Sequence, residues 1–558
     1  MKLTPFAKGF IALVVVAVVG VTGWTYFGSS LKCWSNPDKC RDEAAVRTAV
    51  GSDGGVAAPP STGVAASDFE ALRNSPADPA RNAAVTGVPA APITGARLNR
   101  PLRVGINTWA GHAPGVVANL GLTLGQVQSI YKRNYQLDVE FRIIDDPAAK
   151  FAAFQAGQID VMWDTVDSWA REASVLAEGS VRGRAIIMQD WSRGGDGIVA
   201  TRAIHSVEDL AGKRVATTEF TPSHWLLLYL LSQSGLTTAQ KAQIEHDLVI
   251  TQDAPAAAAM FTAGRVDAAV TWEPDLSSAV AARGDEAHVL VSTTAATNVI
   301  ADCLVARQDI IDSSPATMAA FVAGWFEGIE YMRTDPAGSN AVIARSLNLD
   351  ADTISGMLSG LKLTPFADNA QFFGLTGGHA HYETLFETAF RIWRRKGVVS
   401  RAVNAHDTFE PRFVAATASR YAAQRVVEAA VPARAPSRDD VPILNKTLSI
   451  NFTPNSAEIM PGSFFVLDSL GETMVSFGGT YLRVEGNTDA TGARTANVEL
   501  SQQRADAVRD YLVTTFSIPR ERLQTVGHGP DNPVAPNATE AGRQLNRRTD
   551  IRVVLAAP

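Results

Sequence analysis

Cysteine and histidine are scarce in this chain, which holds three cysteines and nine histidines in 558 residues. The one close histidine pair is His379 and His381, and a His-rich loop explains it better than a metal site does. Neither a phosphate-binding Gly-x-x-x-x-Gly-Lys-Ser/Thr loop nor a Gly-x-Ser-x-Gly nucleophile motif occurs. A net charge of −7 is the wrong sign for a nucleic-acid partner. We therefore expect no catalytic residue, metal, cofactor or nucleic-acid partner, and no enzyme activity.

Long uncharged runs are also rare, and the clearest one lies near the N-terminus. Residues 9–31 carry no charge, with Lys8 before them and Lys32 after them. A helix needs about 20 apolar residues to cross a bilayer. A cleaved signal peptide is the alternative, but its apolar core is usually only about 7–15 residues long. We expect residues 1–32 to form a single-pass anchor in a bacterial inner membrane, with the bulk of the chain in the periplasm.

Two of the three cysteines follow this run directly. Cys33 and Cys40 are close enough in sequence to close a small disulfide loop in an exported protein, and two free thiols are the alternative. Cys303 lies in an apolar run and is expected to be a buried packing residue. Alanine, proline, glycine and serine are abundant up to residue 100, so residues 33–100 are predicted to be a disordered periplasmic linker. A second linker is predicted over residues 431–442.

The middle of the chain, residues 101–430, has the length of a two-lobed α/β protein. Stretches typical of strands alternate with stretches typical of helices, which predicts mostly parallel sheets. Ligands of such folds bind beyond the carboxyl ends of the strands. The predicted strands are 102–106, 137–144, 159–163, 184–188, 197–200, 214–217 and 266–270, and helices are predicted over 148–156 and from residue 223.

Five phrases in this region resemble the periplasmic solute-binding proteins of the nitrate, sulfonate and taurine type, which include binders of thiamine precursors. They are Gly105–Trp109, Ala156–Asp160, Gly194–Ala200, Asp209–Ala216, and Gly264–Ala268 followed by Trp272-Glu273-Pro274. The resemblance implies the two-lobed periplasmic-binding-protein fold. It also implies ligand contacts from Asn107, Trp109, Asp164, Ser192, Asp196, Thr221, Ser223 and Glu273.

Two alternatives accompany this resemblance. Thr221 and Ser223 would open a helix whose free amides can hold an anion, but an ordinary helix cap explains the same residues. Eukaryotic thiamine-pyrimidine synthases share the fold, but they rely on a cysteine-rich motif that this chain lacks.

Acidic residues dominate the loops that would contact the solute, and few lysines or arginines accompany them. An anion such as nitrate would be repelled by such a set of charges. The sequence therefore favours an amine-bearing, zwitterionic or neutral solute. The acidic residues are Asp145, Asp146, Asp164, Asp167, Asp190, Asp196, Glu273 and Asp275.

Near the C-terminus, residues 495–515 suit one helix. An advance of 100° per residue places Arg504 within an apolar stripe on the same side as Asn497. A guanidinium there is costly unless it is paired, and the alternatives are a core carboxylate partner or a side chain that reaches out to water. The same arithmetic places Gln502, Asp506, Arg509 and Asp510 on the opposite side.

The segment around this helix is similar to the OmpA-like peptidoglycan-binding domain, and strands are predicted over 448–452 and 550–554. The matching residues are Thr488-Asp489, Gly492, Asn497, Leu500-Ser501, Arg504-Ala505 and Asn546-Arg547-Arg548. The resemblance implies an α+β domain over residues 443–558. It implies that Asp489 binds the ammonium of a diaminopimelate stem peptide and Arg504 its carboxylate, and that Asn497 and Arg548 complete the site.

Together these features predict a membrane-anchored solute-binding protein that is tethered to peptidoglycan. It would pass a small polar solute to an ABC transporter permease or report the presence of that solute. The alternative is a structural envelope linker, or a ligand-sensing scaffold, with no transport role.

Overall fold

The computed structural model describes residues 93–124, 127–377, 380–399, 401–421, 423–426 and 442–555. The predicted anchor, the Cys33–Cys40 pair, His379 and most of both predicted linkers lie outside the described residues. Within the ranges just given, no helix is both long enough and apolar enough to cross a membrane.

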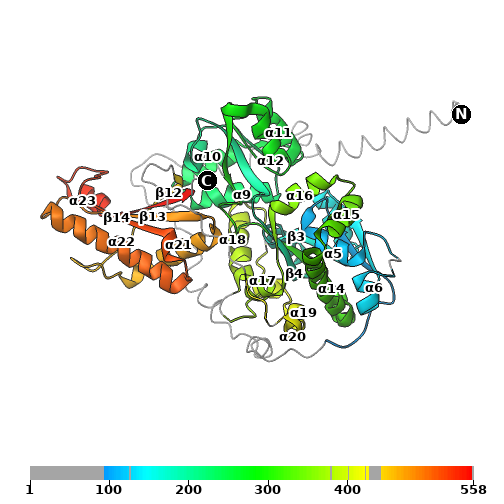
Figure 1. The fold of residues 1–558 in the computed structure, drawn as a ribbon. Helices are drawn as coiled ribbons and strands as arrows, with labels where there is room; N and C mark the ends of the chain where they lie inside the picture. Colours follow the sequence, from blue (N-terminus) through cyan, green and yellow to red (C-terminus); the bar gives the residue numbers. More distant parts are fainter. Residues whose placement is uncertain are drawn as a thin grey trace, which may run out of the picture. The chain divides into compact units, whose positions relative to one another are not determined.

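The first lobe is built on a six-stranded sheet of order β11-β4-β10-β3-β1-β2. Figure 1 labels two of its strands, β3 and β4. Its central strands are buried along nearly their whole length, as their apolar sequences require. The strands are β1 (Leu102–Ile106), β2 (Val139–Ile143), β3 (Val161–Thr165), β4 (Gly183–Ser192), β10 (Ala301–Arg307) and β11 (Leu361–Leu363).

Helices pack around this sheet, and the long α14 contacts both α5 and α6. The helical elements of the first lobe are η2 (Ala110–His112), α5 (Ala113–Asn119), α6 (Ile130–Tyr135), α7 (Pro147–Gln155), α8 (Val166–Leu176), α13 (Gln308–Ser313), α14 (Pro315–Thr334), α15 (Pro336–Leu347), α16 (Ala351–Ser359), α17 (Phe366–Phe372), α18 (His381–Arg395), η5 (Ala405–Thr408), α19 (Arg412–Ala415) and α20 (Ala418–Tyr421).

The second lobe has a five-stranded sheet of order β7-β6-β8-β5-β9. Its strands are β5 (Asp196–Thr201), β6 (Val215–Thr217), β7 (Val249–Ile250), β8 (Ala268–Trp272) and β9 (Ala287–Ser292). Its helical elements are η3 (Val207–Leu210), α9 (Pro222–Gln233), α10 (Thr238–His246), α11 (Ala254–Thr262), α12 (Asp275–Arg283) and η4 (Gly284–Glu286).

Several helices of both lobes begin with the same local chemistry, a capping oxygen followed by proline. Asp146, Thr221 and Asp335 each precede a proline and accept a backbone N–H of the first turn. Such a cap satisfies an amide that has no partner within the helix, and proline at the first position lacks an amide that would need one. The sequence therefore fixes where these helices start.

The chain crosses between the lobes twice, from β4 to β5 and from β9 to β10. Strand β10 returns into the first sheet antiparallel to both β3 and β4, and β5 runs antiparallel to β8 and β9. The prediction of mostly parallel sheets is therefore wrong. The chain leaves the first lobe at the carboxyl end of β4 and returns at the same end of the sheet, so β10 runs in the opposite direction to β4. Both sheets are mixed. The predicted strands of both lobes match β1 to β6 and β8 within a few residues.

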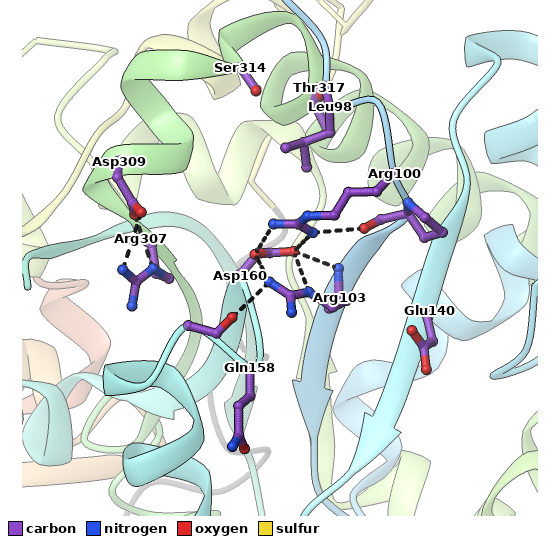
Figure 2. Close-up of polar contacts among 12 residues, drawn as sticks. Leu98, Arg100, Arg103, Glu140, Gln158, Asp160, Arg307, Asp309, Ser314 and Thr317 are labelled. Carbon is purple, nitrogen blue, oxygen red and sulfur yellow. Dashed lines mark hydrogen bonds and ion pairs between the residues drawn. The ribbon is translucent and has the colours of Figure 1, made fainter.

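The buried carboxylate of Asp160 binds residues at and just before the start of β1. Figure 2 shows Arg100 and Arg103 converging on Asp160. Arg100 Nη1 lies 2.6 Å from Asp160 Oδ2, and Arg103 Nη2 lies 2.7 Å from Oδ1. The backbone N–H of Arg103 also donates to Oδ2 at 3.0 Å. Burial alone would raise the pKa of Asp160, but these hydrogen bonds hold it below its ordinary value.

The C-terminal domain is a four-stranded sheet of order β12-β15-β13-β14 with helices packed on it. Its parallel pair β13 and β14 is joined through α22, which contacts both strands and forms a βαβ unit. The elements are β12 (Pro442–Leu448), η6 (Pro461–Ser463), α21 (Phe464–Ser476), β13 (Thr480–Asn487), α22 (Arg494–Phe516), η7 (Arg520–Arg522), β14 (Leu523–Gly529), α23 (Glu540–Asn546) and β15 (Thr549–Leu555).

The helix predicted over 495–515 is confirmed as α22, but the face that it buries differs from the prediction. Its fully buried residues are Ser501, Ala505, Val508 and Leu512, so Arg504 lies beside the buried stripe. Gln502 faces β14 because its Oε1 accepts the Gly527 N–H at 2.8 Å. The buried face of α22 is set by close packing of its backbone on β13. A Cβ on Gly486 would lie only 2.3 Å from the Ser501 carbonyl oxygen, so the Ser501 side of the helix faces the sheet.

Of the two strands predicted near the C-terminus, the structure contains one. The strand at 550–554 is confirmed as part of β15, whereas the one at 448–452 is wrong, because β12 ends at Leu448. Beyond that point the chain turns away from the sheet and closes a loop through a bridge between Phe452 and Ile459.

We predict that Asp160→Ala destabilises the two-lobed domain by about 2–4 kcal/mol, because two guanidinium groups and a backbone amide lose their shared acceptor. Urea unfolding of the chain measures the change. Asp309→Ala is the matched control, because Asp309 is 63% exposed in its pair with Arg307, and such a surface pair contributes about 0–1 kcal/mol. Equal effects of the two substitutions would contradict this account.

Candidate functional site

The carboxyl ends of β1, β3 and β4 and the start of β10 meet at one edge of the first sheet. Strand β10 is antiparallel to β3 on one side and to β4 on the other. Asp302, at the start of β10, is therefore the register partner of both Thr165 and Asp190. The second lobe begins four residues after Ser192, with Asp196 at the start of β5. This edge thus brings together polar residues from both lobes.

Buried acids accumulate at and behind this edge. Burial and mutual repulsion act on them together, since Asp302 interacts electrostatically with four of the others. Lys150, which is 1% exposed, is the one lysine or arginine buried to this degree in the described parts of the two lobes. The acids, with their exposed fractions, are Asp164 (1%), Asp167 (1%), Glu172 (1%), Asp190 (0%), Asp196 (5%) and Asp302 (6%).

Lys150 neutralises only part of this charge. Its Nζ lies 3.2 Å from Asp164 Oδ1 and 3.9 Å from Glu172 Oε2, and it stands 4.6 Å from the centre of the Trp163 ring. Burial alone would lower the pKa of Lys150, but the two carboxylates raise it above its ordinary value, so the ammonium is charged. Asp164 takes the closer contact. Burial, with the charge of Asp164, raises the pKa of Glu172 to about 8.

The other acids have no cation of their own, and their pKa values rise. Burial, with the nearby charge of Asp196, raises the pKa of Asp190 to about 7. Burial raises the pKa of Asp167 to about 7 and that of Asp196 to about 6. The pKa of Asp302 rises well above its ordinary value through burial and the charge of Asp190. Near neutral pH, this edge therefore holds protons that free aspartates would have lost.

Five of the eight residues predicted to contact a solute lie at this edge or beside it. Ser192 Oγ donates to Asp196 Oδ2 at 2.7 Å, which joins the end of β4 to the start of β5. Asn107 is bridged through His112, whose two ring nitrogens lie 2.6 Å from Asn107 Oδ1 and 2.7 Å from Gln189 Oε1. Burial lowers the pKa of His112 to about 4, so the ring is neutral and only one of its two nitrogens donates a hydrogen bond. The remaining two are Trp109 and Asp164.

The other three predicted residues belong to the second lobe. Thr221 caps α9, as the alternative interpretation expected. Glu273 accepts the Ser277 hydroxyl at 2.6 Å and the Ser277 N–H at 3.1 Å, so it holds the start of α12. Ser223 is different, because its hydroxyl is buried and has no hydrogen-bond partner.

Sequence reasoning left Asp190, Asp302 and Lys150 out of the proposed contacts. Asp190 appeared only among the acids of the loops. Asp302 carried a signal that could have found it, since it is the one charged residue in the apolar run from Val299 to Ala306. The sequence gives no comparable signal for Lys150, because a lysine in the middle of a helix is usually exposed.

The C-terminal domain has a separate group of charges at the end of β13. Asp489 Oδ1 accepts the Thr491 N–H at 2.8 Å, and Asp489 Oδ2 pairs with Arg547 Nη1 at 2.6 Å. Asn497 donates to the Thr491 carbonyl at 2.9 Å and holds the same turn. Burial lowers the pKa of Arg504, and the charge of Arg547 lowers it further, which places two guanidinium groups near one carboxylate.

Arg504 and Arg548 have different surroundings in this domain. Arg504 Nε donates to the Ser456 carbonyl at 3.0 Å, and its guanidinium lies over the Phe452 ring. Arg548 pairs instead with Asp550 at 2.9 Å and is 11% exposed. The arginine that contacts Asp489 is thus Arg547, which the sequence-based site did not include.

Comparison with known proteins assigns families to both parts. Residues 197–339 match the family model described as NMT1/THI5 like, and residues 451–547 match that of the OmpA family. The periplasmic aliphatic sulphonate binding protein SsuA from Escherichia coli aligns with a TM-score of 0.44 and 18% sequence identity, over 62% of this chain and 99% of that protein. The chain therefore carries a region similar to the NMT1/THI5-like family followed by a C-terminal region similar to the OmpA family.

Curated relatives align with the C-terminal part. Outer membrane porin F from Pseudomonas aeruginosa is 35% identical over 111 residues, which is 20% of this chain and 32% of that protein. Peptidoglycan-binding protein ArfA from Mycobacterium tuberculosis is 35% identical over 124 residues, 22% of this chain and 38% of that protein. The chain thus spans about a third of the length of these two relatives.

The raised pKa values predict that the two-lobed domain becomes less stable as the pH rises. Between pH 6.5 and 8.5 the unfolded chain has already lost its aspartate and glutamate protons, whereas the folded chain still holds some of them. Folding therefore binds protons, and the free energy of unfolding decreases as pH rises through this window. The buried histidines act mainly below pH 6.5, where their unfolded forms gain a proton.

Thermal unfolding of the ligand-free chain across this window measures the effect. We expect the melting temperature of the two-lobed domain to fall by several degrees. The control Asp309→Asn, at a 63% exposed position of the first lobe, keeps the same slope. A melting temperature that is constant or rises over this range would show that the buried acids are not protonated as described.

Proposed function

We propose that this chain is a periplasmic solute-binding protein that an N-terminal segment anchors in the inner membrane and a C-terminal domain holds against peptidoglycan. The observation that carries the solute-binding half is the group of buried polar atoms without hydrogen-bond partners where the two lobes meet. They include both Asp190 oxygens and Trp109 Nε1. Buried polar atoms are nearly always paired in folded proteins, so such a group is best explained by a missing ligand.

The fold is suited to this role. Ligands of α/β folds bind beyond the carboxyl ends of strands, and here those ends belong to two lobes that are joined by two crossovers. Gly195 lies in the first crossover, and its N–H donates to the Gly360 carbonyl at 3.0 Å. The solute would pass to an ABC-type permease, or its binding would be reported to another envelope protein. Neither role requires a catalytic residue or a cofactor.

The second half of the proposal is that Asp489, Asn497 and Arg504 bind the diaminopimelate stem peptide, with Arg547 in the place first given to Arg548. Support comes from the charges, because Arg547 is held by both Asp489 and Glu540, whereas the Arg504 guanidinium has no carboxylate ion pair among the described residues and can attract an anionic group. Asp489, which already accepts from Arg547, has lone pairs left for an ammonium. A relative named as a peptidoglycan-binding protein aligns over this domain.

A thermal-shift screen of the full-length chain in detergent tests the solute-binding half. Amines, amino acids, thiamine precursors, sulfonates, nitrate and phosphate would be compared. A solute that binds only the folded form stabilises it by about 2.7 kcal/mol at one hundred times its dissociation constant. No stabilisation by any of them, on a chain shown to be folded, would favour the alternative of a structural envelope linker.

We predict that Arg504→Ala weakens co-sedimentation with diaminopimelate-containing sacculi about 10- to 100-fold, because a charge-assisted hydrogen bond contributes about 1.5–3 kcal/mol. Arg494→Ala is the matched control, since that side chain is 66% exposed and pairs with Asp531. Circular dichroism verifies that both variants fold. Undiminished binding by a folded Arg504→Ala variant would reject this assignment.

A further inference from the structure

Two of the buried acids face each other directly across neighbouring strands. Asp190 on β4 and Asp302 on β10 are register partners in an antiparallel pair, next to a β-bulge that follows Asp302, and the charge of Asp190 acts on the Asp302 carboxyl. The Cβ atoms of such partners lie about 4.5–5.5 Å apart, and like charges at this spacing are destabilising. Both residues are buried, Asp190 completely and Asp302 to all but 6%. This arrangement needs a positive charge or a shared proton.

The carboxylate of Asp190 has none of the hydrogen bonds that a buried carboxylate needs. Neither of its oxygens has a partner, and the indole Nε1 of Trp109 has none either. The indole N–H of Trp109 is directed toward this carboxylate and lowers the pKa of Asp190 as a hydrogen-bond donor would, although its geometry falls short of a formed hydrogen bond. A Cβ on Gly111 would lie 1.9 Å from Asp190 Oδ2 and 2.7 Å from Trp109 Nε1, so both groups occupy space that only glycine leaves.

The nearby cations are committed elsewhere. Lys150 pairs with Asp164 and lies over Trp163. Lys362, on the strand beside β4, pairs with Asp368 at 2.5 Å. A metal ion is not favoured either, because no three His, Cys, Asp or Glu residues in the described part of the chain are grouped to hold one. Among the described residues, neither carboxylate of the pair therefore has a cationic partner, and the Asp190 oxygens accept no formed hydrogen bond.

We infer that the solute of the two-lobed domain is a small organic cation with N–H donors, an amine, amidine or guanidine, whose cationic nitrogen lies between Asp190 and Asp302. Its N–H groups supply the hydrogen bonds that the Asp190 oxygens lack, and its charge offsets two like charges at once. A quaternary ammonium has the charge but no N–H to donate. Trp109 extends from this pair to the crossover, where a Cβ on Gly195 would lie 2.9 Å from its ring, and so forms one wall of the site.

This inference rests on the proposed function, but one experiment can reject the inference and still leave the proposed function standing. The full-length chain in detergent at pH 8 would be titrated with agmatine, putrescine and benzamidine as cations, choline as a quaternary ammonium, and methanesulfonate and nitrate as anions. We expect at least one N–H cation to raise the melting temperature and neither choline nor the anions to do so. Stabilisation by an anion or by choline alone would keep the solute-binding function and overturn the inference. No stabilisation by any of the probes would count against both.

Asp190→Asn gives a second readout that does not depend on the choice of probe. Without ligand at pH 8, the variant loses an uncompensated buried charge, so its melting temperature should rise by about 2–4 °C. Its affinity for the stabilising cation should fall about 30-fold or more. A purely structural Asp190 would give the opposite result, a lower melting temperature without ligand, and would overturn the inference. Asp309→Asn, a 63% exposed member of a surface pair in the same lobe, should change neither value.

Discussion

An excess of buried carboxylates over buried cations is the constraint on which the two-lobed domain depends. Six acids are buried where the lobes meet or just behind that edge, and Lys150 gives one of them, Asp164, a close ion pair. Glu172 lies 3.3 Å from Arg171, and the remaining four are tolerated because burial raises their pKa values and keeps them partly protonated. Such an arrangement makes the ligand-free fold less stable than its apolar core would allow, and it reserves that free energy for a ligand that brings positive charge.

The topology explains why the acids lie where they do. The two crossovers bring β10 back between β3 and β4, so Asp164, Asp190 and Asp302 gather at one edge although they are far apart in sequence. The acidic residue of the proposed site in the C-terminal domain is compensated differently. Asp489 is already paired with Arg547, which also pairs with Glu540, so these carboxylates have a cationic partner within the protein. The two domains thus differ in how their acidic side chains are compensated.

Local chemistry made much of this fold predictable. Alternating apolar patterns placed most strands, and the prediction of a cap at Thr221 holds because capping depends on neighbouring residues alone. What failed depended on distant contacts. Strand direction followed from the crossovers, which periodicity does not reveal. The buried face of α22 was set by glycines on β13 and β14. Arg547 and Arg548 are adjacent, and only the turn between α23 and β15 decides which of them contacts Asp489.

Proton counting during binding tests the central claim most directly. Calorimetric titration of the full-length chain with the cation that stabilises it, at pH 6.5 in buffers of different ionisation enthalpy, measures the protons exchanged. Because the pKa of Asp190 is raised to about 7 in the ligand-free chain, a bound cation should drive the acids to ionise. The account predicts release of about one proton for each cation bound. Binding without proton release, or with proton uptake, would contradict it.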